Sequence, residues 1–133
     1  MDEIVTLLKK ISDFCSLGAV SDELIKAAEN DLGITFSSDY NAYLSNYGVG
    51  TFADVELTGI VNSPRLNVVT VTKESRKSYS NFPKDMYVIH STDFEGIDIL
   101  QNSKGQIFQF DPSGQIKHIY NSLSEYVLSC IIQ

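Results

Sequence analysis

The sequence predicts an α+β domain, with N-terminal helices packed on a mostly antiparallel sheet and a further helix at the C-terminus. Three observations lead to this class. Apolar residues recur at helical spacing up to residue 47. Short strand-like segments then follow one another between residues 86 and 120, with turn residues between them. A last apolar segment of helical spacing closes the chain.

Two helices are expected before the first sharp corner of the chain. The apolar face of the first comprises Ile4, Leu7, Leu8, Ile11 and Cys15, and this helix ends at Leu17-Gly18. The second begins after the cap Ser21 and ends at Gly33, where Ile34 folds back as an apolar contact. Its apolar stripe comprises Leu24, Ala28 and Leu32.

A third helix is expected to follow, rich in tyrosine. Its stripe, at positions i, i+3, i+4 and i+7, comprises Tyr40, Tyr43, Leu44 and Tyr47. Ser37 or Ser38 caps its start and Gly48 ends it. We interpret the stripe as a core-facing surface with tyrosine hydroxyls at its rim, and an aromatic binding platform is the alternative.

The pattern changes to period two after the third helix. Val55, Leu57 and Gly59 alternate with Glu56 and Thr58, which predicts a strand. Residues 66–80 are ambiguous, because they open with β-branched residues but continue with a polar, helix-compatible half. A helical stripe in this segment would comprise Leu66, Val69, Lys73, Arg76 and Tyr79.

The later chain predicts an antiparallel meander and a closing helix. Four strand-like segments lie at 86–91, 96–101, 106–111 and 115–120. The connections NSKG and DPSG have turn chemistry, with Pro112 at the first central position of a turn. Ser122 or Ser124 caps the closing helix.

Length and charge limit the possible functions. The 133 residues suffice for a single domain, 1–133, and the net charge of −7 reflects 10 basic against 17 acidic residues. The one short basic cluster is Lys73, Arg76 and Lys77, so direct nucleic-acid binding is not expected. An acidic surface suits a basic protein partner.

The start of the sequence and the length of its apolar runs suggest a cytoplasmic protein. Met1 is followed by Asp2 and Glu3, unlike the positive start of a signal peptide, and no apolar run approaches the roughly 18 residues of a membrane span. In this compartment Cys15 and Cys130 are expected to be reduced, buried core residues.

The residues that could carry chemistry form no recognisable set. His90 and His118 both lie in strand candidates, and neither has a second ligand at metal-binding spacing. The run from His90 to Asp93 has the residue types of a triad, but a triad depends on spatial arrangement. The sequence therefore predicts no enzyme, no metal and no cofactor.

The order of these motifs resembles the SUKH superfamily, the Smi/Knr-like fold. Its marker is an acidic amphipathic helix ending in Leu-Gly, a corner, an Asp-Tyr pair that opens the next helix, and a glycine-rich exit. Here these are Glu29 to Gly33, Phe36 to Tyr40, and Gly48 to Gly50. The resemblance covers nearly the whole chain and implies a helix over 66–80. Ser37 stands where the family commonly has proline, and serine can cap the same turn.

Many members of this superfamily are immunity proteins that bind and block a cognate polymorphic toxin, often a nuclease. The resemblance therefore implies a bacterial antitoxin that binds a basic protein toxin, such as an RNase or DNase. The alternative is an intracellular interaction scaffold or regulator without a toxin partner. On charge, the acidic residues expected to contact the partner are Asp54, Glu56, Asp93, Glu95 and Asp98. For any one of them, a charge that only keeps a turn solvated is the better explanation, so the expectation applies to the group.

Overall fold

A computed structural model describes residues 3–92 and 94–131 and confirms the α+β class. The helices are α1 (Glu3–Lys9), α2 (Asp22–Leu32), α3 (Ser38–Tyr47), the 3-10 helix η1 (Pro64–Leu66), α4 (Val68–Ser78) and α5 (Leu123–Ile131). The strands are β1 (Cys15–Ser16), β2 (Gly50–Phe52), β3 (Val55–Glu56), β4 (Met86–Ser91), β5 (Asp98–Asn102), β6 (Ile107–Phe110) and β7 (Ile116–Tyr120).

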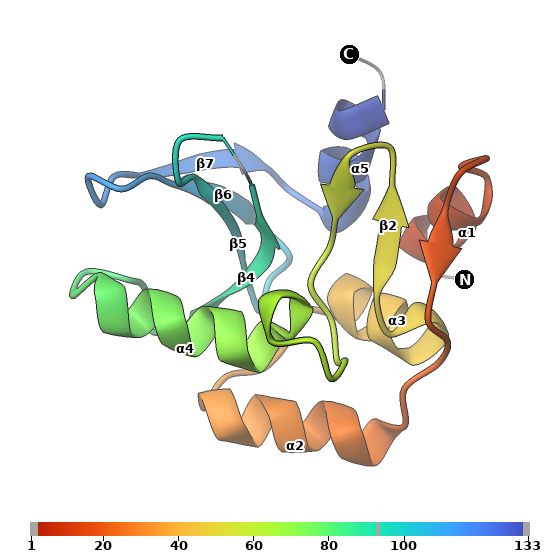
Figure 1. The fold of residues 1–133 in the computed structure, drawn as a ribbon, viewed down its shortest axis with the longest axis horizontal. Helices are drawn as coiled ribbons and strands as arrows, with labels where there is room; N and C mark the ends of the chain where they lie inside the picture. Colours follow the sequence, from red (N-terminus) through yellow and green to blue (C-terminus); the bar gives the residue numbers. More distant parts are fainter. Residues whose placement is uncertain (1–2, 93, 132–133) are drawn as a thin grey trace.

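The strands form two antiparallel sheets. The small sheet has the order β1-β2-β3, and the large sheet has the order β4-β5-β6-β7 of the predicted meander. The turn before β7 is the predicted one, since the Gly114 N–H donates to the Asp111 carbonyl at 2.9 Å. Helix α4 lies along one face of the large sheet, and α5 lies between the large sheet and the β2–β3 hairpin (Figure 1).

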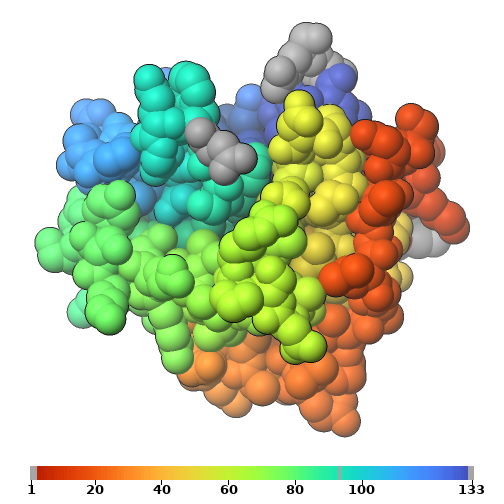
Figure 2. Space-filling view, viewed as in Figure 1, coloured from red at the N-terminus to blue at the C-terminus, as the bar shows by residue number. Residues whose placement is uncertain are grey.

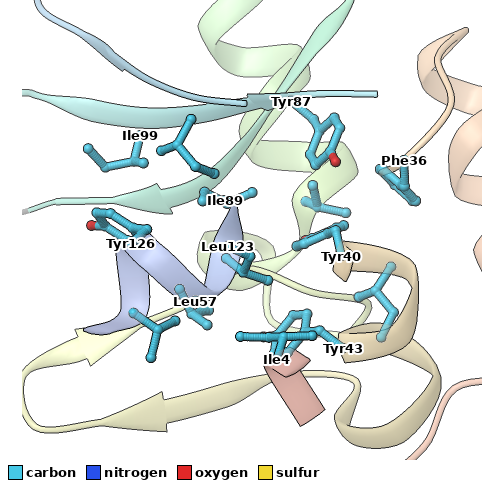
Figure 3. Close-up of a cluster of buried hydrophobic side chains, with 14 of the residues drawn as sticks. Ile4, Phe36, Tyr40, Tyr43, Leu57, Tyr87, Ile89, Ile99, Leu123 and Tyr126 are labelled. Atoms are coloured by element: carbon cyan, nitrogen blue, oxygen red, sulfur yellow. The ribbon is translucent and has the colours of Figure 1, made fainter. Parts of the chain in front are cut away.

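The main core fills the space between the two sheets and the N-terminal helices. Figure 3 shows Leu57 and Leu123 between the β2–β3 hairpin and the large sheet, with Tyr40 and Tyr43 entering from α3. A smaller apolar cluster lies between α4 and the other face of the large sheet. Its buried members are Phe82, Met86, Val88, Leu100 and Phe110.

The tyrosine stripe is part of the core, as predicted. Tyr40, Tyr43 and Leu44 are fully buried, and Tyr47 is half-buried with its hydroxyl donating to the Val5 carbonyl of α1 at 3.0 Å. The expectation that the hydroxyls lie at a rim is wrong for the first two. Both contact the buried Thr58, and burial raises the pKa of each phenol above its ordinary value.

The first helix is shorter than predicted. Helix α1 ends at Lys9, and the chain then turns so that Cys15 enters the edge strand β1 and pairs with Thr51. Cys15 is therefore exposed and Cys130 half-buried, so the prediction of two buried thiols is wrong, although both are free. The predicted stripe of α2 is confirmed at Ala28 and Leu32 and wrong at Leu24, which is exposed while Ile25 is buried. Ser21 and Gly33 bound this helix as predicted.

The ambiguous segment is mainly helical. Asn67 caps α4, because its side-chain oxygen accepts from the Val69 and Thr70 N–H groups at 3.0 and 3.1 Å. This cap, rather than β propensity, decides the local structure. The buried face of α4 comprises Val68, Thr72 and Ser75, and not the stripe that helical spacing from Leu66 had suggested.

The strand predicted over 55–59 is regular only at Val55–Glu56. Beyond it the chain crosses from one sheet to the other, since the Leu57 N–H donates to Gly50 and the Thr58 N–H to Ile89. Gly59 is required at this crossing, because a Cβ there would lie 1.8 Å from the Gly48 carbonyl oxygen. No helix in the described part of the chain is long and apolar enough to cross a bilayer.

Leu44→Ala should destabilise the protein by about 2–5 kcal/mol, because it leaves a cavity beneath fully buried tyrosines. Leu24→Ala deletes the same atoms from a side chain that is 54% exposed, so it should change stability by no more than about 0.5 kcal/mol. Urea melts of the two variants measure both values. Equal effects would contradict the packing described for α2 and α3.

The two thiols should react with a thiol reagent at different rates. Cys15 is exposed, whereas burial of Cys130 limits access and raises the pKa of its thiol, so less thiolate is present. We expect rapid labelling of one thiol per folded molecule and slow labelling of the other. Cys15→Ser should remove the rapid phase, and a rapid phase that survives this substitution would contradict the assignment.

Candidate partner-binding groove

Three hollows join into one groove between the β2–β3 hairpin, η1, α4 and the end of β4. The first, of about 330 Å³, is lined by Asp54, Glu56, His90, Ser91, Thr92 and Phe94. The middle one is lined by Glu56, Thr58, Arg65, Leu66 and Ser91. The third adds residues of α4, and Ser91 lines all three. In Figure 2 the teal loop after β4 lies beside the yellow to yellow-green segment that contains β3 and η1.

One wall of the groove is built by the hairpin of the small sheet. Ala53 turns the chain with a positive φ of 48°, and its N–H donates to the Asp13 carboxylate at 2.7 Å. This turn leaves Asp54 exposed at the hairpin tip. Glu56 follows on β3, and its carboxylate accepts hydrogen bonds from both terminal nitrogens of Arg65, at 2.5 and 2.9 Å. These hydrogen bonds lower the pKa of the Glu56 carboxyl, which keeps it charged.

The opposite wall is the loop between β4 and β5. The Thr92 N–H donates to the Ile97 carbonyl at 3.1 Å, and the Ile97 N–H donates to Phe94, so the loop is tight. Its tip carries Phe94, which is 66% exposed, and the exposed Glu95 with a φ of 55°. Asp93, the other predicted contact in this loop, lies outside the described residues.

Asp98 differs from the expectation of a partner contact, because it is the first residue of β5 and is buried. It is only 9% exposed, and its carboxylate accepts hydrogen bonds from Ser75 and Ser91 at 3.0 and 3.1 Å. Burial raises the pKa of this carboxyl. Asp98 therefore positions two serines of the groove and does not face a partner.

The histidines are held by aromatic and backbone groups. His90 Nδ1 lies 2.6 Å from the Tyr126 hydroxyl, and His118 Nε2 lies 2.9 Å from the Tyr120 carbonyl oxygen. The Ser91 hydroxyl donates to Asp98, whereas in a Ser-His-Asp triad the serine hydroxyl donates to the imidazole. Within the described residues, no group of three or more His, Cys, Asp or Glu side chains could hold a metal ion.

Of the predicted acidic residues, Asp54 and Glu56 meet in one hollow, and Glu95 lies next to Phe94, which lines the same hollow. Arg65 and Phe94 were missed by the sequence analysis. For Arg65 no local signal exists, because its partner Glu56 lies nine positions away across a loop. For Phe94 the signal was a large aromatic residue in an otherwise polar turn segment.

The fold and the groove define an α+β protein that carries a mixed-charge groove suited to binding. The chain matches the family model SUKH_5, described as SMI1-KNR4 cell-wall, over residues 1–132. It therefore belongs to the SMI1-KNR4 family of the SUKH superfamily. Comparison with curated proteins gives no significant match.

The sequence markers that carried the resemblance have structural roles. The Glu29 carboxylate accepts from the Phe36 N–H at 2.8 Å and closes the corner between α2 and α3. Asp39 accepts from the Leu123 N–H at 2.8 Å, at the start of α5, and from Gln101 of β5 at 3.0 Å. Tyr40 reaches Thr58. These residues join distant elements, so they define the fold and not a partner surface.

Asp98→Asn should flatten the pH dependence of stability. Because burial raises the folded-state pKa of Asp98, the folded protein binds this proton more tightly than the unfolded chain. The Asp98 contribution to the unfolding free energy should therefore increase as pH falls from neutral toward the ordinary aspartate pKa, 3.8. Urea melts across this range should show the increase in the unmodified protein and not in the variant. The exposed Asp85→Asn is the matched control, and an identical profile for all three proteins would contradict the buried charge.

Proposed function

We propose that this protein is an immunity protein, an antitoxin that binds a cognate bacterial toxin and blocks it by stoichiometric occlusion. The observation that carries the proposal is the groove, where two carboxylates and an exposed aromatic ring face solvent on a fold whose family contains such proteins. Large aromatic side chains beside charged groups are typical of residues that dominate binding energy at protein interfaces. The proposed role is binding and not catalysis, in the cytoplasm.

Charge supports a basic partner. With a net charge of −7, the protein attracts cationic surfaces at long range. A toxin that cleaves RNA or DNA needs a basic surface for its substrate. An acidic protein that covers this surface blocks substrate access without any chemistry of its own. A nuclease is therefore the toxin class that we propose.

The contact residues proposed are Asp54, Glu56 and Glu95. Asp54 is exposed at the hairpin tip and shares a hollow with Glu56 of β3, and Glu95 is exposed in the loop after β4, next to Phe94 of the same hollow. Loops at strand ends can present carboxylates without disturbing the core. The buried Asp98 carboxylate accepts a hydrogen bond from Ser91 and so holds this serine of the groove in position.

A scaffold or regulator without a toxin partner is the second candidate. The description of the matching family mentions the cell wall and no toxin. Affinity purification from the native cell separates the two. Co-elution of a basic protein encoded beside this gene supports the immunity role, and co-elution of cellular proteins without toxic activity supports the scaffold.

Reversal of Asp54, Glu56 and Glu95 to lysine should reduce the association rate with the co-purified toxin by about tenfold or more at low salt. The salt dependence of this rate should flatten, and the melting temperature should change little, because all three side chains are at least partly exposed. Stopped-flow association at several salt concentrations measures the effect.

The control has the same total charge but reverses Glu3 on α1, Glu23 on α2 and Asp85 before β4, which lie outside the β2–β3 hairpin and the loop after β4. It should associate faster than the groove variant. If the two triple variants lose association rate equally, or if the groove variant still protects cells from the toxin, the groove is not the contact surface.

A further inference from the structure

The centre of the groove is occupied by a charged pair from the chain itself. Glu56 lines the first and middle hollows, Arg65 lines the middle and third, and the two side chains meet between them. The Arg65 guanidinium makes a bidentate contact with the Glu56 carboxylate, with Nη1 donating to Oε1 at 2.5 Å and Nη2 donating to Oε2 at 2.9 Å. A carboxylate in the groove is thus already bound to an arginine.

This contact lies at the protein surface. The side chains of Arg65 and Glu56 are 66% and 43% exposed, and exposed ion pairs contribute little net stability because water solvates both charges. Arg65 lies on the short helix η1, at the surface, so its side chain can leave Glu56 without exposing core atoms. The pair can therefore exchange with an external cation of the same shape.

The surroundings of Glu56 suit an arginine better than a lysine. A carboxylate accepts two parallel hydrogen bonds from the planar guanidinium, whereas an ammonium offers a point charge. The exposed ring of Phe94 lines the same hollow, and guanidinium groups stack on aromatic faces. Asp54 adds a second carboxylate at the rim.

The floor of the groove suits the backbone of an extended segment. The exposed Ser91 and the half-buried Thr92 line it, and the exposed Ser78 lies at its α4 end. The Ser91 hydroxyl donates to Asp98, so it is fixed in position. Preformed polar groups of this kind orient a ligand with little loss of conformational entropy.

From these contacts we infer that the groove receives an extended, arginine-bearing segment of the partner, whose guanidinium replaces that of Arg65 on Glu56. Arg65 is then an internal competitor that occupies the arginine position in the free protein. The inference rests on the proposed function only in assigning the segment to the toxin. The groove chemistry itself is independent of the partner's identity.

The test uses an acetylated and amidated pentapeptide with two arginines, titrated into the labelled protein and followed by nuclear magnetic resonance. Arg65→Gln removes the competitor and should tighten peptide binding about two- to fivefold, the range expected for release of an exposed ion pair. Amide shifts should concentrate at Ser91, Thr92 and Glu56.

Lys73→Gln is the matched control. It also removes one positive charge and breaks an exposed ion pair, Lys73 to Asp31 at 2.6 Å, but Lys73 lines none of the three hollows. It should leave peptide affinity within about 1.5-fold of the unmodified protein, because the exposed charge is screened by salt. Glu56→Gln should remove the preference for the arginine peptide over the same peptide with lysines.

Equal effects of Arg65→Gln and Lys73→Gln, or weaker binding by Arg65→Gln, would overturn the inference. The groove charge-reversal variant could lose toxin binding while Arg65→Gln does not gain peptide affinity. This result would overturn the role of Arg65 as a competitor and leave the proposed function intact. Peptide binding that tightens in Arg65→Gln, with no toxin among the co-purified proteins, would support the groove and overturn the proposed function.

Discussion

The fold depends on the hydrogen bonds of one buried threonine. The Thr58 hydroxyl donates to the Val88 carbonyl at 2.8 Å, so the Tyr40 hydroxyl, 2.9 Å away, is the donor to Thr58. The Tyr43 hydroxyl donates to the Thr58 carbonyl at 2.8 Å and accepts from the Gly50 N–H. Helix α3, the small sheet and the large sheet thus meet at one residue. Because these groups are buried, each lost partner would leave an unsatisfied polar atom in the core.

The groove is a consequence of this junction. The chain has to cross from β3 to the large sheet at Thr58, so the two sheets separate on the outer side of the crossing. Thr58 lines the middle hollow, while Tyr40 and Tyr43 bind it from the core side. The groove side of Thr58 therefore carries polar and charged side chains, and the core side carries aromatic rings. The position of the groove is fixed by the core, whereas its charge is set by loops.

A second junction explains why the Asp-Tyr pair recurs as a marker. Asp39 caps α5 and binds Gln101, and the Tyr87 hydroxyl donates to Gln101 while it accepts from the Ser37 N–H. These bonds fasten α3, α5 and the large sheet together across long sequence separations. Since they are internal, variation in partners can be carried by the hairpin tip and the loop after β4 without cost to the fold.

The sequence by itself determined the elements whose signals are local. Helical spacing, the Ser21 and Ser37 caps, the glycine stops and the turn at Pro112 predicted α2, α3 and the meander, because such effects act within a few residues. It also determined the family, since the markers lie in these elements.

Only the tertiary structure decided features that depend on pairing across the chain. Cys15 left the expected helix because β2 provides a strand partner for it, and Asp98 is buried because Ser75 and Ser91 satisfy its carboxylate. The Glu56–Arg65 pair joins two elements through a loop that carries no periodic signal. Long-range hydrogen bonds and packing set these positions, and neither leaves a pattern in neighbouring residues.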